Sequence, residues 1–157
     1  MRQIAKGRLF GAALFLALPA IADPVLEVHL DTGAVLAGWA MAEGSEACLT
    51  WNHSVTGGKV ADCFGQTSGK LVLRRSYLHD FAAGLGEVQG RGTLVSSAIG
   101  GYWIEGIDEP VADNRLTLRI GAAAVGHQLH LSGQVLPLSE IAPHQRARIV
   151  LNFPTED

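Results

Sequence analysis

The amino-acid sequence predicts an all-β protein: a single-domain sandwich or barrel of short, mostly antiparallel strands, with little helix after the N-terminal segment. Apolar and polar residues alternate in many short stretches, and turn signals rich in Gly, Asp and Ser separate these stretches. No long amphipathic helix pattern occurs after residue 22. Together these features are typical of β-sandwiches and barrels. The spacing of the turn signals predicts roughly seven to ten strands.

The first 22 residues have the three parts of a secretory signal peptide. A positively charged start precedes an apolar stretch over residues 9–18, and Ala20-Ile21-Ala22 supplies the small-x-small pattern that signal peptidase requires. The apolar stretch is too short for a membrane-spanning helix, which needs about 20 residues. We therefore expect cleavage after Ala22, a periplasmic location and a single β domain over residues 23–157.

The composition of the remaining chain restricts its partners. The N-terminal segment carries three positive charges and no negative one, so its removal lowers the net charge from −3 to −6. An acidic domain without a basic cluster is a poor ligand for nucleic acids or anionic membranes. We expect neither as a partner, and no membrane span after cleavage.

Strands are predicted wherever the alternation has a period of two. They cover residues 25–30, 35–39, 48–53, 59–64, 70–77, 93–99, 102–107, 115–120, 126–131 and 146–153. Single helical turns are expected near residues 80–83 and 137–143, with Ser139 as a possible cap of the second. A glycine-rich loop is expected between the fifth and sixth strands, and Asp108-Glu109-Pro110 is expected to end the seventh.

The central hairpin, Cys48 to Phe64, contains both cysteines of the chain. Two cysteines in an exported protein predict one disulfide. The bridge requires the two cysteines to lie opposite each other in the hairpin. A regular antiparallel pairing that turns at Gly57-Gly58 would instead place Cys63 opposite Asn52. The bridge therefore requires a hairpin centred near Val55-Thr56, or a bulge or wide loop.

Six residues are candidates for binding or interaction, because they combine titratable or hydroxyl groups with a departure from regular alternation. They are His53, Ser54, Asp62, Asp80, Glu87 and Arg91. Neighbouring residues on a strand point to opposite faces, so His53 and Ser54 are badly placed to share a proton. The G-x-S-x-G motif of many hydrolases does not occur. A structural role is the alternative, with Ser54 and Thr56 bonding the loop backbone.

Metal and nucleotide sites are weakly supported. His53, Asp62, His79, Asp80 and Glu87 are possible ligands of a divalent ion, but their spacing fits no dense metal-binding motif. A dinucleotide-binding fingerprint needs a strand before the glycine-rich loop and a helix after it, whereas here a strand follows and no helix does. We expect no metal ion, no cofactor and no catalytic residue.

Four stretches resemble the family known as domain of unknown function 1850. They are WNHSV at 51–55, a valine-acid-aromatic pattern at 60–64, FAAGLGE at 81–87 and LRIG at 118–121. The similarity extends over roughly residues 26–153, and His-Ser-Val is its most specific part. The cysteine pair is not carried over as a family trait.

Members of this family are typically small proteins encoded with TRAP-type transporters of the TAXI class. The resemblance implies an exported accessory or interaction module of solute uptake, and it implies no activity. Its partner would be the TRAP membrane subunit or the solute-binding protein. The alternative is a small periplasmic hydrolase or metal-dependent enzyme that uses His53 with a nearby carboxylate.

Overall fold

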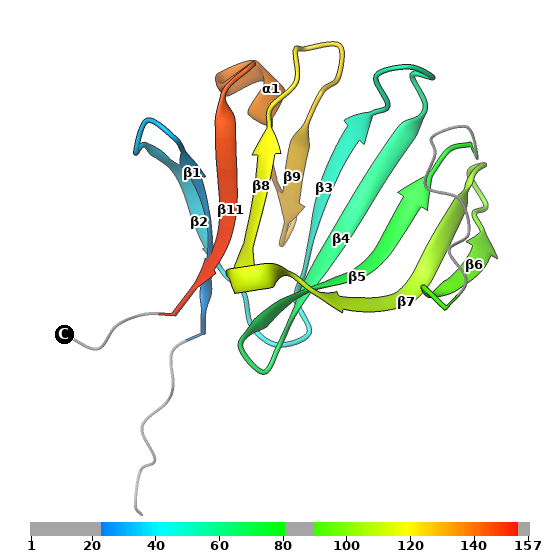
Figure 1. The fold of residues 1–157 in the computed structure, drawn as a ribbon, viewed down its shortest axis with the longest axis horizontal. Helices are drawn as coiled ribbons and strands as arrows, with labels where there is room; N and C mark the ends of the chain where they lie inside the picture. Colours follow the sequence, from blue (N-terminus) through cyan, green and yellow to red (C-terminus); the bar gives the residue numbers. More distant parts are fainter. Residues whose placement is uncertain (1–22, 81–89, 154–157) are drawn as a thin grey trace, which may run out of the picture.

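The strands form two antiparallel sheets packed face to face (Figure 1). This computed structural model describes residues 23–80 and 90–153. The expected signal peptide and Glu87 lie outside the described residues, as does all but the first residue of the helical turn expected near 80–83. The first sheet has the order β2 (Val35–Ala40), β1 (Val25–Leu30), β11 (Arg146–Asn152), β8 (Arg115–Arg119). The second has the order β10 (Gln134–Leu136), β9 (Gln128–Leu131), β3 (Glu46–Asn52), β4 (Lys59–Thr67), β5 (Lys70–Leu78), β7 (Tyr102–Pro110), β6 (Thr93–Ser96).

The all-β prediction is confirmed. Of the two predicted architectures, sandwich and barrel, the structure has the sandwich. The described residues contain eleven strands, one more than the upper end of the predicted range. The additional strand is β10, which pairs with β9 through the two-residue turn Ser132-Gly133. Both turn residues have positive φ angles, 52° and 76°, as a tight hairpin of this type requires.

The alternation of apolar residues places one face of each sheet in a common core. Leu26, Val28 and Leu30 of β1 are almost fully buried against the partner sheet. Their counterparts on β11 are Ala147, Ile149 and Leu151. Residues of β3, β9 and β5 close the core from the other side: Ala47, Leu49, Leu129, Leu131 and Leu71. The two-residue period is therefore sufficient to define which side of each of these strands is buried.

Several strand boundaries differ from expectation, among them the ends of β7 and β6. Asp108-Glu109-Pro110 does not end β7, which continues to Pro110 along β5 past an irregularity in their register. In this irregular part of β7 the backbone of Asp108 adopts a positive φ of 48°. β6 ends at Ser96, three residues earlier than predicted, because Ser97 already belongs to the turn that leads into β7.

The short helix α1 (Leu138–Ile141) confirms the helical turn expected there, but Ser139 is not its cap. The N-cap is Pro137, and no side chain bonds the helix start. Ser139 is buried instead, where its hydroxyl donates to the Gly121 carbonyl and accepts from the His127 N–H. Ser139 thus joins α1 to the β8–β9 connection. The partner of Ser139 in this connection, His127, is itself partly buried, and this burial lowers the pKa of its imidazole.

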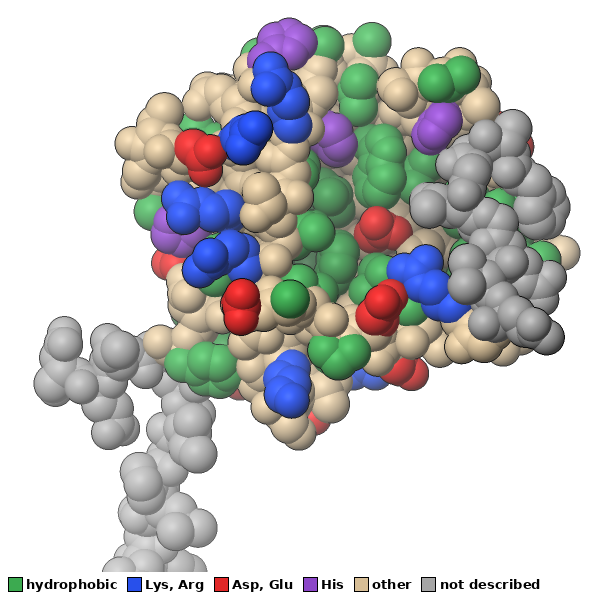
Figure 2. Space-filling model, in the orientation of Figure 1, with side chains coloured by type: hydrophobic (Ala, Val, Ile, Leu, Met, Phe, Trp, Pro, Cys, Tyr) green, Lys and Arg blue, Asp and Glu red, His purple; other side chains and the backbone are tan. Residues whose placement is uncertain are grey.

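The seven-stranded sheet is wider than the sheet that covers it, so part of its inner face is left outside the main core. A second, smaller cluster lies there, formed by Leu78, Tyr102 and Ile104 with Ile107 beside it. In the space-filling view a hollow with hydrophobic side chains on its floor opens between the two sheets, and charged side chains stand at its margin (Figure 2). We refer to this region as the inner hollow.

Candidate functional site

The central hairpin has the register that the disulfide needs. Cys48 lies directly opposite Cys63, and Asn52 lies opposite Lys59. The hairpin is therefore centred between Val55 and Thr56, one of the solutions expected from the sequence, and not at Gly57-Gly58. The Cys48–Cys63 bridge is formed, with a Cα–Cα distance of 4.0 Å.

This register also decides which side chains share a face of the sheet. Residues directly opposite each other in an antiparallel pair point to the same side. Cys48 and Cys63 therefore project from the outer face. Leu49 is a core residue, so Asp62, which lies opposite it, projects from the inner face. A carboxylate thus stands among the apolar residues of that face.

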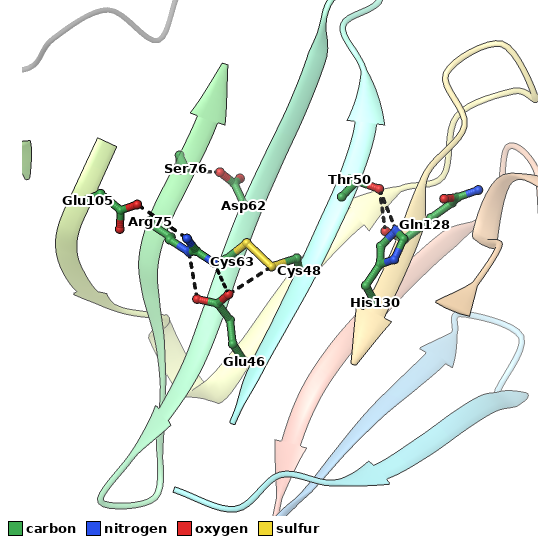
Figure 3. The surroundings of a disulfide bond; sticks show 10 residues. All are labelled: Glu46, Cys48, Thr50, Asp62, Cys63, Arg75, Ser76, Glu105, Gln128 and His130. Atoms are coloured by element: carbon green, nitrogen blue, oxygen red, sulfur yellow. Dashed lines mark hydrogen bonds and ion pairs between the residues drawn. A yellow bond between two sulfur atoms is a disulfide. The ribbon is translucent and has the colours of Figure 1, made fainter. Parts of the chain in front are cut away.

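The outer face carries a charged cluster around the disulfide (Figure 3). Arg75 donates two hydrogen bonds to the Glu46 carboxylate, at 3.0 and 2.6 Å, and lies 3.6 Å from Glu105. Its guanidinium stacks 4.4 Å from the centre of the Trp103 ring. Glu46 in turn lies 3.6 Å from Cys48 Sγ. The Glu46 hydrogen bond raises the pKa of Arg75, so the guanidinium remains protonated beside the two carboxylates.

Asp62 is a carboxylate whose protonation is altered by the fold. Ser76, its cross-strand neighbour on β5, donates a hydrogen bond of 2.6 Å to Asp62 Oδ1 (Figure 3). Loss of solvent around the carboxylate raises the pKa of Asp62, and the Ser76 hydrogen bond and the charge of Arg91 only partly offset this. A carboxylate kept at such a cost in an otherwise apolar surface is a common mark of a functional site.

The surroundings of Asp62 combine apolar contact area with charge. Trp51 is two residues from Leu49 along β3, so it is a diagonal neighbour of Asp62, with side chains within roughly 7 Å of each other. The Trp51 ring is half-buried and packs against His127 at a centroid distance of 5.9 Å. Arg91 donates to Glu109 at 3.1 and 3.0 Å. The carboxylates of Asp62 and Glu109 and the guanidinium of Arg91 together leave the site with a net charge of about −1 at neutral pH.

The raised pKa of Asp62 has a consequence for stability. A group whose pKa is raised on folding stabilises the protein below the unfolded pKa, about 3.9 for aspartate, and this contribution is lost as the pH rises through the folded pKa. Asp62→Asn keeps an oxygen for Ser76 but cannot ionise. We expect the variant to be more stable than the wild type at pH 7 and to lose that advantage near pH 3.5. Urea unfolding at the two pH values measures this.

Asp108→Asn is the matched control. Asp108 is exposed and makes a 3.3 Å ion pair with Arg74. Exposed pairs contribute about 0–1 kcal/mol, so this variant should be unchanged or slightly less stable at pH 7. An Asp62→Asn variant that is less stable than the wild type at pH 7 would contradict the desolvation of Asp62.

The other candidates from the sequence lie at the hairpin tip or outside the described residues. His53 Nδ1 accepts from the Thr56 N–H at 3.3 Å, and Thr56 Oγ1 accepts from the Gly58 N–H, so Thr56 has the expected loop-bonding role. Ser54 is exposed. Asp80, two residues after the end of β5, lies against the same loop, because a side chain added at Gly58 would meet Asp80 Oδ2 at 2.9 Å.

The structure does not bring all of these residues together. His53 follows Leu49, the partner of Asp62, by four positions, so His53 and Asp62 are roughly 13 Å apart at the usual strand rise. Asp80 is the carboxylate placed near the loop of His53, and Arg91 is the residue placed near Asp62. Within residues 23–80 and 90–153, the one group of three metal-ligand side chains is Glu46, Cys48 and Cys63, whose sulfurs are joined to each other.

The comparison with protein families identifies a relationship over the middle of the chain. The sequence profile of the domain of unknown function DUF1850 matches residues 48–138, which is more than half of the chain. The chain belongs to the DUF1850 family. No curated protein and no solved structure matches it.

The DUF1850 match is narrower than the stretch of residues 26–153 expected from the resemblance. It begins within β3 and ends at the start of α1, so it includes almost the whole seven-stranded sheet and β8. Strands β1, β2 and β11, which make up the rest of the four-stranded sheet, lie outside it. Asp62, Ser76, Arg91 and Glu109 all lie inside the matched part. The inner hollow is therefore built chiefly from the part of the chain that defines the family.

Proposed function

We propose that this DUF1850 protein is an exported, non-catalytic interaction module of TAXI-type TRAP solute uptake, and that the inner hollow is its contact with a transporter component. The observation that carries the proposal is the Asp62 carboxylate on the apolar inner face of the seven-stranded sheet. Its burial destabilises the fold at neutral pH, which is expected where a charge serves recognition.

The geometry favours binding over chemistry. Ser76 donates its proton to Asp62, and in the described part of the chain no histidine bonds either group, so the pair lacks the base of a hydrolytic triad. What the hollow offers is half-buried apolar surface from Trp51 together with excess negative charge. An apolar segment of a partner protein with a basic side chain over Asp62 would complement both features.

Two further observations support export. The N-terminal segment has the pattern of a secretory signal peptide. The Cys48–Cys63 bridge is suited to an oxidising compartment. No helix in the described ranges has the length and hydropathy needed to cross a bilayer. The link to TRAP transporters rests on the resemblance to a family encoded with them.

The decisive test is solute uptake in a strain that lacks the gene and carries a single TAXI-type TRAP system. We expect the wild-type gene to restore TRAP-dependent uptake, and Asp62→Asn to fail although it folds. The matched control is Asp108→Asn, which changes the same chemical group on the exposed surface and should restore uptake fully.

The TRAP link and the role of the inner hollow would be contradicted by different results. Normal uptake in the strain without the gene would disprove the TRAP link. Full restoration by Asp62→Asn would instead exclude the inner hollow as the contact. Titration of the purified protein against the purified solute-binding protein, and separately against detergent-solubilised TRAP membrane subunits, identifies the partner component.

A further inference from the structure

A second site lies at the end of the sandwich opposite the β3–β4 hairpin tip. A pocket of about 1080 Å³ opens there between the N-terminal residues, the β2–β3 and β4–β5 connections and the β7–β8 connection. This volume is slightly above the usual range for small-molecule sites, about 300–1,000 Å³. The pocket is independent of the inner hollow, because Gln66 at its floor is separated from Asp62 on the same face of β4 by the buried ring of Phe64.

Gln66 is the unusual feature of this pocket. The side chain lines the pocket with only 6% of its surface exposed, and no hydrogen bond from the described residues reaches its Oε1. Buried amides are almost always hydrogen-bonded, because an unpaired buried acceptor is costly. The nearby Asn114 shows the usual situation: its amide accepts from the Leu71 N–H and donates to the Gly69 carbonyl.

The rest of the lining indicates which ligand could pair with Gln66. Three acidic side chains line the pocket: Asp23, Glu43 and Asp113. In the exported protein they exceed by one the two positive charges there, Lys70 and the α-amino group that cleavage after Ala22 leaves on Asp23, so the pocket favours a cation. Apolar surface comes from Pro24, Pro110, Val111 and Phe153. A ligand for this pocket therefore needs N–H donors, a positive charge and a hydrocarbon body.

We propose that this pocket binds a small organic amine, whose ammonium group donates to the Gln66 amide oxygen while its hydrocarbon part packs on the prolines, Val111 and Phe153. Because Gln66 Oε1 is itself buried, binding requires the amide to rotate about its last torsion, which is broad and roughly two-fold in glutamine. The acidic side chains at the rim supply the counter-charge.

Three probes with the same six-carbon chain test the proposal on the exported protein. Hexylamine should bind saturably and shift the NMR signals of the Gln66 side-chain amide. Hexanol, which donates a hydrogen bond but has no charge, should bind more weakly, and hexanoate most weakly. Raising the salt concentration should weaken the binding of hexylamine more than that of hexanol, since screening acts on the charge.

Two variants make the test specific. Gln66→Leu removes the unpaired amide, so it should fold, and it should bind hexylamine about tenfold less tightly because a charge-assisted hydrogen bond is lost. Glu43→Gln with Asp113→Asn should reduce the preference for hexylamine over hexanol. Equal affinity for hexylamine in Gln66→Leu and wild type, equal binding of hexanol and hexylamine, or no saturable binding would each overturn the proposal.

Discussion

Replacing both cysteines, Cys48→Ala with Cys63→Ala, should lower the free energy of unfolding by about 3 kcal/mol. The bridge closes a loop with a sequence separation of 15, and loss of that constraint enlarges the conformational freedom of the unfolded chain. The sulfurs also join β3 to β4 in the middle of the seven-stranded sheet, next to the salt bridge of Glu46 and Arg75. Guanidinium chloride unfolding of the two proteins under non-reducing conditions measures the difference.

Chemical reduction gives an independent check on the same quantity. A dithiol reductant should destabilise the wild type by a similar amount and leave the alanine variant unchanged, because the variant has no bridge to lose. Cys63 is fully buried, so part of the loss in the variant comes from the smaller side chain. A loss below about 1 kcal/mol in both experiments would show that the bridge constrains the unfolded chain far less than loop closure implies.

The strands that the sequence predicts well are those with one apolar and one polar side. In β1, Leu26, Val28 and Leu30 alternate with Glu27 and His29, and the structure buries the first set. The same holds for β11. In such strands a shift of one residue would expose the whole apolar set, so the pattern alone determines the orientation of the strand.

β4 shows why the candidate site was harder to predict. Its sequence, KVADCFGQT, is apolar on both faces near the middle, because Ala61 and Cys63 match Val60 and Phe64. The pattern therefore does not reveal that Asp62 faces inward. That follows only from the pairing with β3, where Asp62 lies opposite the core residue Leu49. The acidic side chain makes Asp62 a candidate, but its burial does not follow from the sequence pattern.

The partners of the candidate residues come from elements distant in the chain, which sequence spacing does not bring together. Ser76 reaches Asp62 from β5, and Glu109 reaches Arg91 from the end of β7, a stretch predicted to be a break. The Glu46–Arg75–Glu105 cluster likewise joins three strands. The alternation in β5 does not reveal this cluster, because it places Arg75 on the same side as the buried Leu71. Only the register shift between β4 and β5 turns Arg75 to the outer face, opposite Cys63.

Gly101→Ala is expected to destabilise the protein by about 3 kcal/mol, an effect as large as loss of the disulfide. Gly101 lies in the turn between β6 and β7 with a φ of 69°, in the left-handed region that disfavours a side chain. An added Cβ would also collide with the Leu78 carbonyl oxygen and would lie 2.8 Å from both the His79 Cα and the Tyr77 hydroxyl. Backbone of β5 cannot yield without disturbing its pairing with β7.

Gly100→Ala is a matched control in the adjacent position. Gly100 has a more positive φ, 90°, but an added Cβ would meet only the edge of the His79 ring, at 3.9 Å. This variant therefore has the conformational strain without the collision, and it should lose about 1–2 kcal/mol. Urea unfolding of both variants measures the two costs separately. Equal losses in the two variants would show that β5 and the β6–β7 turn are not packed as closely as this structure places them.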